Sequence, residues 1–189
     1  KLLDYAARAG ARQFVLASTG GLYGRLGEPV TEQTQLAPVA GPLQYYFETK
    51  RSAEGLALSY ADRMSVSILR PFFLYGPGQR QPKLIPRLID RVRAGSVITL
   101  RGPSGASLNP THVDDAVAVI EGCVNGQHRG VVNLGGGQVT TIRSIATRIA
   151  GLLGVDVSFA LEEGAPECFV ADVTVMSSLI KRRPIGFDD

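Results

Sequence analysis

Cysteine is scarce in this sequence, and its two copies lie far apart. Cys123 and Cys168 have no spacing typical of a metal site or a redox pair. A cysteine-ligated metal and a disulfide framework are therefore not expected, and no metal site is predicted. Unpaired cysteines fit a reducing compartment, so we expect the protein to be cytoplasmic.

A large excess of charge of one sign and long apolar runs are also missing. The net charge is only +3 and the basic residues are scattered, which argues against a nucleic-acid partner. The one basic run, Lys181-Arg182-Arg183, is expected to be a solvated helix terminus. The sequence shows no secretory signal and no long apolar run, so membrane insertion is not expected. With 44% apolar and 20% charged residues, the 189-residue chain has the composition of a soluble globular domain with one sizeable core.

The stretch Gln44 to Lys50 is the feature around which the rest of the chain is organised. It follows a Pro/Gly break and opens a helical run from Leu43 to about Asp62. Residues four apart share one face of a helix, so Tyr46 and Lys50 are neighbours while Tyr45 points away. An ammonium beside a phenol stabilises the phenolate, which makes the pair a plausible acid–base couple. The spacing alone also fits an ordinary helix tyrosine with a solvated lysine nearby.

Two further segments place chemistry-bearing residues after buried strands. The strand from Arg12 to Ala17 runs into Ser18-Thr19-Gly20-Gly21-Leu22-Tyr23-Gly24. The strand from Val66 to Pro71 runs into Phe72-Phe73-Leu74-Tyr75-Gly76-Pro77-Gly78-Gln79. Hydroxyls and glycines at the carboxyl ends of parallel strands are where α/β sheets hold their active sites.

In this order, the motifs Ser-Thr-x-x-Leu-Tyr-Gly, Tyr-x-x-x-Lys and Arg-Pro-x-x-x-Tyr-Gly-Pro-x-Gln resemble those of the extended short-chain dehydrogenase/reductases. More narrowly, the chain resembles the NAD-dependent epimerase/dehydratase family over nearly its whole length. The resemblance implies an α/β fold: the C-terminal part of a Rossmann-like parallel sheet plus a small α/β lobe on the substrate side. Residues 1–78 and 107–135 would form the remainder of the dinucleotide-binding domain, and residues 79–106 and 136–189 the substrate-side lobe.

The chain alternates between strand and helix throughout, which argues for a right-handed parallel sheet. The punctuated loop from Gly27 to Gly41 is long for a connection and is expected to be functional. His112-Val113-Asp114-Asp115 begins a helix to about Val124, and we expect its charged residues to be structural rather than catalytic. Gly135-Gly136-Gly137 has the wrong spacing for a phosphate loop. The other expected elements are helices at 1–8, 84–94, 142–153 and after Val173, and strands at 97–100, 130–134 and 155–161.

The resemblance implies a catalytic set of Thr19, Tyr46 and Lys50. Tyr46 would exchange a proton with a substrate hydroxyl, Lys50 would hold the cofactor ribose hydroxyls, and Thr19 would fix the substrate oxygen. The cofactor would be NAD or NADP. The predicted cofactor-binding residues are Ser18, Tyr46, Lys50, Pro71 and Phe72, and the predicted substrate-contacting residues are Thr19, Gly20, Phe73 and Arg80.

One departure from the family pattern restricts the expected reaction. Family dehydratases carry an acid and a base after the catalytic threonine, where this chain has Gly20 and Gly21. Glycine has no side chain to transfer a proton, so loss of water is not expected. The two glycines are instead expected to leave room for substrate beside Thr19.

A second departure concerns the substrate. Phe73 stands where the family has an asparagine, and Leu108-Asn109-Pro110 replaces the family's Arg-Asp-Phe. The loss of that arginine argues against a nucleotide-sugar substrate, because a diphosphate is best held by charge-assisted donors. Arg80, Lys83 or Arg101 could substitute for it.

The resemblance thus implies an NAD(P)-dependent oxidoreductase or epimerase that acts on a secondary alcohol or ketone, sugar-like or another small molecule. Two alternatives stay open: a non-catalytic dinucleotide sensor of the same fold, and an inactive fragment. The sequence does not begin with Met, and the glycine fingerprint that follows the family's first strand is absent. It is therefore expected to be N-terminally truncated and to bind NAD(H) weakly by itself. The complete protein is expected to be a homodimer without nucleic-acid or membrane partners.

Overall fold

The computed structural model of the chain describes residues 1–24, 27–38, 40–80 and 82–188. Its first lobe is built on a three-stranded parallel sheet in the order β1-β2-β5. These strands are β1 (Gln13–Ala17), β2 (Ser65–Pro71) and β5 (Gly130–Leu134). All three strands were predicted from the sequence, and the expected Rossmann-like parallel sheet is confirmed.

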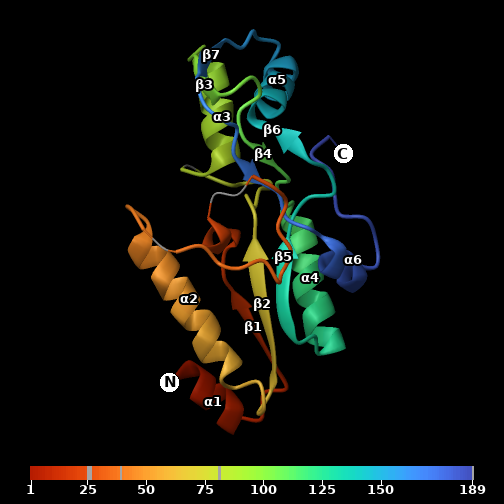
Figure 1. Cartoon of the computed structure of the whole chain (residues 1–189). Helices are drawn as coiled ribbons and strands as arrows, with labels where there is room; N and C mark the ends of the chain where they lie inside the picture. The colour runs from red at the N-terminus through yellow and green to blue at the C-terminus, as the bar shows by residue number, and fades with distance from the viewer. Residues whose placement is uncertain (25–26, 39, 81, 189) are drawn as a thin grey trace.

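Helices cover both faces of this sheet (Figure 1). One face carries α1 and α2, and the opposite face carries α4 and α6. Side chains of β2 alternate between the two faces, with Ile68 packing toward Ala57 of α2 and Leu69 toward Val119 of α4. The central strand is therefore buried along almost its whole length. The four helices are α1 (Leu2–Arg8), α2 (Gln44–Leu58), α4 (Val113–Gly126) and α6 (Thr174–Ile180).

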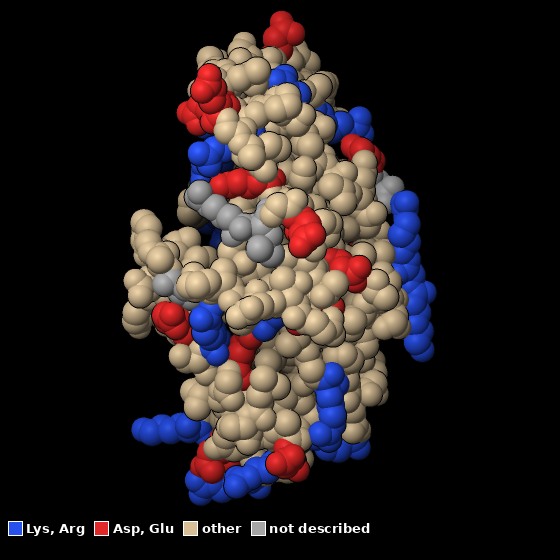
Figure 2. Space-filling view, viewed as in Figure 1, with Lys and Arg blue, Asp and Glu red and all other residues tan. Residues whose placement is uncertain are grey.

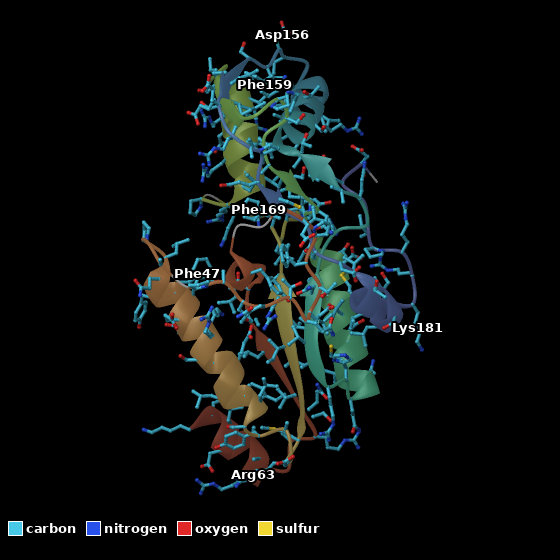
Figure 3. The ribbon with its side chains drawn as sticks, viewed as in Figure 1. Phe47, Arg63, Asp156, Phe159, Phe169 and Lys181 are labelled. Carbon is cyan, nitrogen blue, oxygen red and sulfur yellow. The ribbon has the colours of Figure 1, made fainter. Side chains whose placement is uncertain are left out.

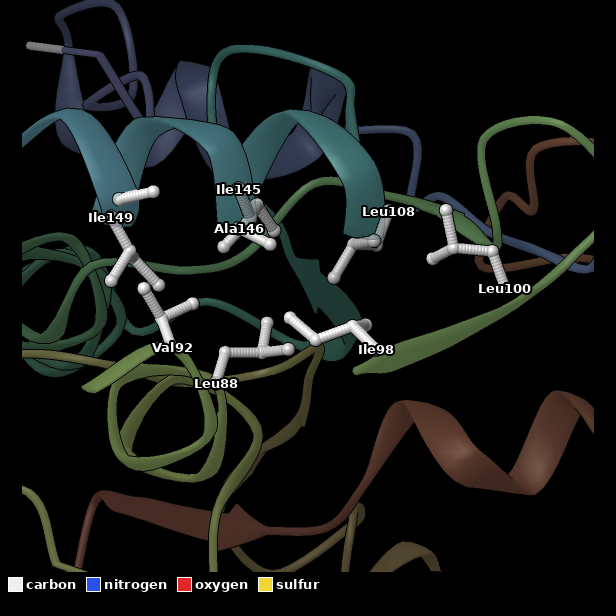
Figure 4. Close-up of a cluster of buried hydrophobic side chains, with 9 residues drawn as sticks. Leu88, Val92, Ile98, Leu100, Leu108, Ile145, Ala146 and Ile149 are labelled. Carbon is white, nitrogen blue, oxygen red and sulfur yellow. The ribbon is translucent and has the colours of Figure 1, made fainter. Parts of the chain in front are cut away.

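A second lobe has its own core between α3 and α5 (Figure 4). Leu88 and Val92 of α3 face Ile145 and Ile149 of α5, and all four are buried. The helices are α3 (Leu84–Arg93) and α5 (Ile142–Leu153), and the strands are β3 (Ile98–Arg101), β4 (Ser107–Leu108), β6 (Thr140–Thr141), β7 (Phe159–Glu162) and β8 (Cys168–Phe169). The predicted start of α5 is confirmed, because Thr141 Oγ1 accepts from the Ser144 N–H at 3.2 Å.

The second lobe contains both parallel and antiparallel strand pairs. β3 pairs with β7 in parallel, and β4 pairs with β8 in parallel, but β4 and β6 run antiparallel.

Two boundaries also differ from the sequence expectation. α2 ends at Leu58 and not near Asp62, because Ser59 Oγ bonds the Leu56 carbonyl and the next residues form turns. The strand β7 begins at Phe159 and not at Val155. The helical spacing of apolar residues continues through the turns after α2, and for this reason the sequence predicted a longer helix than the structure has.

The segment 112–115 has the structural role that was expected. His112 is the N-cap of α4, and its Nδ1 accepts from the Asp114 N–H at 3.3 Å. Asp115 is fully buried, and its Oδ2 accepts from the Ile185 N–H at 2.7 Å. Arg182 Nη2 lies 2.6 Å from Asp115 Oδ1, so the expectation of a merely solvated basic run is wrong for Arg182. These contacts hold the C-terminal segment against α4, although it lies within the range 136–189 assigned to the second lobe.

Acidic and basic side chains are interspersed over the face shown in Figure 2. Within the part of the chain that the structure describes, no helix combines the length and the hydropathy needed to cross a membrane. The described residues also contain no group of three or more His, Cys, Asp or Glu side chains placed to share a metal ion.

Candidate active site

Tyr46 and Lys50 lie side by side on α2, as their spacing predicts. The Lys50 Nζ is 5.9 Å from the centroid of the Tyr46 ring, and it donates to the Ala17 carbonyl at 2.8 Å. Tyr46 is 43% exposed, whereas Tyr45 is 87% exposed. The lysine therefore ties the middle of α2 to the carboxyl end of β1 and leaves the phenol accessible from outside.

Thr19 is the second residue after the end of β1. Its Oγ1 accepts from the Gly21 N–H at 3.2 Å and caps the short 3₁₀ helix η1 (Gly20–Tyr23). Thr19 is half-buried, and its hydroxyl proton is not used by this cap. The structure thus brings Thr19 and Lys50 to the same strand end.

Ser18 has a different environment. It is 5% exposed, and its hydroxyl donates to the carboxylate of Glu54 in the interior. Its backbone N–H donates to the Leu69 carbonyl at 2.7 Å. The cofactor contact predicted for Ser18 therefore gains no support from this geometry, since the hydroxyl is committed to a buried partner.

The two glycines after Thr19 are packed against aromatic rings. A Cβ on Gly20 would lie 2.3 Å from Phe72 Cε2, and one on Gly21 would lie 2.5 Å from Phe47 Cε1. The expectation that both glycines leave room for substrate is wrong at Gly20, which is buried under the Phe72 ring. The missing side chains allow the rings to approach the backbone.

The residues after β2 are largely internal. Phe72 is 5% exposed and stacks on Tyr23, with ring centroids 6.0 Å apart. Its N–H donates to the Leu134 carbonyl at 2.9 Å, and its carbonyl accepts from Thr111. Pro71, the last residue of β2, is half-buried. Pro71 and Phe72 were both predicted to bind the cofactor, and of the two only Pro71 is therefore open to the surface.

Phe73 and Arg80, both predicted to contact substrate, lie beyond this strand end. Phe73 has φ 44°, an uncommon backbone conformation for a bulky residue, and its ring packs edge-on to Phe169 at 5.8 Å. Arg80 is exposed. Phe73 therefore helps to join the two lobes, and no contact of Arg80 with Thr19, Tyr46 or Lys50 is found among the described residues.

An open cleft of about 700 Å³ lies next to the Thr19 turn. Phe47 on α2 and Phe169 on β8 are among its lining residues, and both are labelled in Figure 3. The predicted functional loop from Gly27 to Gly41 supplies part of its wall. The lining residues are Gly21, Leu22, Gly24, Ala37, Pro38, Ala40, Pro42, Leu43, Phe47, Glu167 and Phe169. The cleft is mainly apolar and borders the site of Tyr46 through the neighbouring Phe47.

Sequence reasoning missed a buried ion pair behind this site. Arg70 Nη2 lies 2.6 Å from Glu54 Oε2, and both residues are 5% exposed. Burial lowers the pKa of Arg70, but its bonds to Glu54 and Tyr23 outweigh this and raise the pKa overall. Burial also raises the pKa of Tyr23, although Arg70 and Asn133 oppose the shift. The available signal was Arg70 itself, because an arginine in a strand expected to be buried requires a partner.

Comparison with known proteins identifies the class to which this fold and site belong. Residues 1–135 match the model of the NAD dependent epimerase/dehydratase family. The match covers well over half of the chain, and the chain therefore belongs to this family. The resemblance seen in the three motifs is confirmed.

Individual relatives are similar over most of the chain. It is 28% identical over 191 residues to an uncharacterized UDP-glucose epimerase, YtcB, of Bacillus subtilis (strain 168), covering 97% of this chain and 59% of the relative. It is 33% identical over 159 residues to a dTDP-glucose 4,6-dehydratase of Streptomyces griseus, covering 82% of this chain and 47% of the relative. The chain thus spans about half of the length of these relatives.

Two solved structures share the fold. UDP-glucuronic acid 4-epimerase from Bacillus cereus, in complex with NAD, superposes with a TM-score of 0.82 at 25% identity, covering 97% of this chain and 60% of that one. MoeE5, in complex with UDP-glucuronic acid and NAD, gives a TM-score of 0.78 at 30% identity, covering 97% of this chain and 63% of that one. Both neighbours are complexes with NAD.

Proposed function

We propose that the complete protein is an NAD-dependent oxidoreductase or epimerase that acts at a secondary alcohol carbon through Thr19, Tyr46 and Lys50. The observation that carries this proposal is the tie between Lys50 Nζ and the Ala17 carbonyl. It holds the Tyr46–Lys50 pair at the end of the strand that leads into Thr19. The carboxyl ends of parallel strands are where α/β sheets bind ligands.

The residues present suit NAD, which accepts a hydride from an alcohol carbon and can return it. An ammonium and a phenol are donors that match ribose hydroxyls, and both are reachable from outside the chain. Lys50 and Tyr46 would hold the cofactor, with Pro71 at its edge. We propose NAD over NADP because both solved neighbours are complexes with NAD.

Each proposed catalytic residue has a definite task. Tyr46 takes a proton from the substrate hydroxyl and gives it back to the carbonyl oxygen. The Lys50 ammonium, which donates to the Ala17 carbonyl, would hold the cofactor beside Tyr46. Thr19 Oγ1 accepts from the Gly21 N–H, so its own proton is free to be donated to the substrate oxygen. This bond would hold the reacting oxygen in place for proton transfer.

The reaction is proposed to proceed without loss of water. Relatives of this chain include both epimerases and dehydratases. Gly20 and Gly21 offer no acid or base beside Thr19, and the Phe72 and Phe47 rings exclude added side chains there. Redox exchange at a hydroxyl, including epimerisation through a transient ketone, is therefore favoured over dehydration.

We propose a sugar-like substrate that is less polar on one side than a nucleotide sugar. Asn109 lies in the segment Leu108-Asn109-Pro110, which replaces the family's Arg-Asp-Phe. It is 2% exposed, and its side-chain amide bonds both the carbonyl and the N–H of Ala171. It is therefore a structural residue and not a phosphate ligand. The apolar lining of the cleft, with Phe47 and Phe169, suits an apolar part of the substrate.

We also propose that the complete protein forms a homodimer through α1 and α2 in the cytoplasm. Large apolar side chains on these helices are exposed: Leu2 at 68%, Tyr5 at 71% and Leu56 at 61%. Exposed apolar side chains gathered on adjacent helices favour an interface. Light scattering of the complete protein would measure its mass, and a monomer at micromolar concentration would contradict the proposal.

Tyr46→Phe in the complete protein tests the proposed chemistry. The substitution keeps the ring and removes the transferable proton, so kcat should fall by about 10²–10⁴, while the NAD affinity should fall much less because Lys50 still holds the cofactor. Tyr45→Phe is the matched control, because Tyr45 is the next residue on the same helix and is 87% exposed. That variant should turn over like the wild type. A wild-type kcat in Tyr46→Phe would refute the assignment.

A further inference from the structure

A buried polar network lies directly behind the candidate site, and Glu54 is its centre. Arg70 Nε donates to Glu54 Oε1 at 3.0 Å and Arg70 Nη2 donates to Oε2 at 2.6 Å, which makes the pair bidentate. The Ser18 hydroxyl donates to the same carboxylate. Arg70 Nη1 also donates to the Tyr23 hydroxyl at 2.8 Å, and Tyr23 donates to Asn133 Oδ1 at 2.8 Å.

This network, named here the Glu54 network (Ser18, Tyr23, Glu54, Arg70 and Asn133), joins every element that forms the site. Ser18 precedes Thr19, Tyr23 ends η1, Arg70 is in β2 and Asn133 is in β5. All five residues are at most 5% exposed. None of them can touch a substrate, so any effect on chemistry must pass through their neighbours.

Glu54 connects the network to the proposed acid–base pair. It lies four residues after Lys50 and eight after Tyr46, so the three side chains share one face of α2. All of α2 is described, and Glu54 and Ala57 are its only buried residues. Glu54 is therefore the buried polar anchor of the helix on the sheet, in addition to the more exposed bond from Lys50 Nζ to the Ala17 carbonyl.

Small movements of α2 would matter for proton transfer. A helix with its side chains has a radius of about 5–6 Å, so a rotation of about 20° would move a side-chain tip by about 2 Å. A misplacement of about 1 Å in a reacting group can cost about 10²-fold in rate. Apolar contacts such as those of Ala57 restrain such a rotation poorly, because they are not directional.

We propose that Glu54, held by Arg70, is a positioning residue that fixes Tyr46 and Lys50 relative to Thr19. The proposal rests on the proposed function and adds Glu54, which lies outside the three sequence motifs. A buried ion pair is often no more stabilising than apolar residues of similar volume. The Glu54 carboxylate and the Arg70 guanidinium make four directional bonds, which fix the geometry of the network. An apolar pair could not fix this geometry.

The test compares three variants of the complete protein. Glu54→Gln keeps the shape and removes the charge. The double variant with Glu54→Met and Arg70→Met replaces the pair by apolar side chains of similar size. Glu48→Gln is the matched control, because Glu48 is an exposed glutamate on the same helix. For each, the melting temperature, the NADH affinity, kcat, KM and the pH profile of kcat are measured well below the melting transition.

If Glu54 positions the pair, Glu54→Gln should lower kcat by about 10–100-fold, with KM changed less than about threefold. The pH at which kcat is half-maximal should shift, because the Tyr46 and Lys50 side chains no longer keep their relative positions. The double variant should melt near the wild-type temperature and still show the low kcat, whereas Glu48→Gln should match the wild type throughout. If Glu54→Gln does not fold, the double variant decides alone.

A kcat within twofold of wild type in a folded Glu54→Gln or double variant would show that the network only stabilises the fold. Tyr46→Phe is assayed in parallel to separate the two proposals. An inactive Tyr46→Phe beside fully active Glu54 variants would overturn the positioning role and leave the proposed function standing. A fully active Tyr46→Phe would overturn both.

Discussion

Gly20→Ala probes the close packing of the turn beside Thr19. An ideal Cβ on Gly20 would lie 2.3 Å from Phe72 Cε2 and 2.6 Å from Phe72 Cζ. Carbon atoms in contact normally stay about 3.5–4.0 Å apart, so the ring or the turn must move by more than about 1 Å. Phe72 is 5% exposed and stacks on Tyr23, so it cannot swing away into solvent.

The expected cost follows from this overlap. Forcing an extra carbon into a packed core typically destabilises by about 1–3 kcal/mol. For a chain of this size, about 1 kcal/mol shifts the melting temperature by about 2–4 °C. Gly20→Ala should therefore lower the melting temperature by about 2–12 °C.

Gly55→Ala is the matched control for this substitution. Gly55 lies inside α2, is exposed, and has no atom within 4 Å of an added Cβ. Alanine is favoured over glycine in a helix interior by about 0.5–1 kcal/mol, so this variant should melt about 1–4 °C higher. Thermal and urea unfolding followed by circular dichroism measure both. A Gly20→Ala variant as stable as the wild type would refute the packing argument.

Three further outcomes are expected. Burial lowers the pKa of His128, with Glu32 opposing the shift, so below about pH 6.5 the unfolded chain binds more protons than the folded one. Stability in urea should fall from pH 7 to pH 5, and His128→Gln should flatten this fall. Asn109→Leu should destabilise by about 2–6 kcal/mol in urea titrations, because the buried N–H and carbonyl of Ala171 would lose their partner. Mass spectrometry of products from nucleotide hexoses and simple alcohols should show no loss of water, since Gly20 and Gly21 carry no acid or base; a product lighter by one water would contradict this.

The parts of the fold that the sequence predicts are those decided by local chemistry. The strand β5 was placed at residues 130–134 because a short β-branched run is followed by glycines. The limits of α5 follow from the Thr141 cap and from Gly154, which takes the left-handed conformation that ends the helix. That Tyr46 and Lys50 are neighbours can be predicted from the helical period alone.

The parts that the sequence does not predict depend on contacts between distant segments. Arg70 and Glu54 are each ordinary charged residues in the sequence, and only the tertiary fold makes them a buried pair. The same is true of Gly20, whose empty side is filled by Phe72, the residue after β2. The antiparallel pairing of β6 rests on two residues, which is too short for a pattern.

The strand pairing of the second lobe also determines when that lobe can fold. β3 starts at Ile98, and its partner residue in β7 is Phe159, about 60 residues later. A ribosome that adds about 5–20 residues per second needs about 3–12 s to make that interval. During this time β3 has no partner strand, and its edge could pair with another chain. The three strands β1, β2 and β5 of the first lobe are all made by Leu134, before β7, whereas α6, which covers one face of their sheet, follows β7. Aggregation during synthesis should therefore begin at β3 and be reduced by slower initiation.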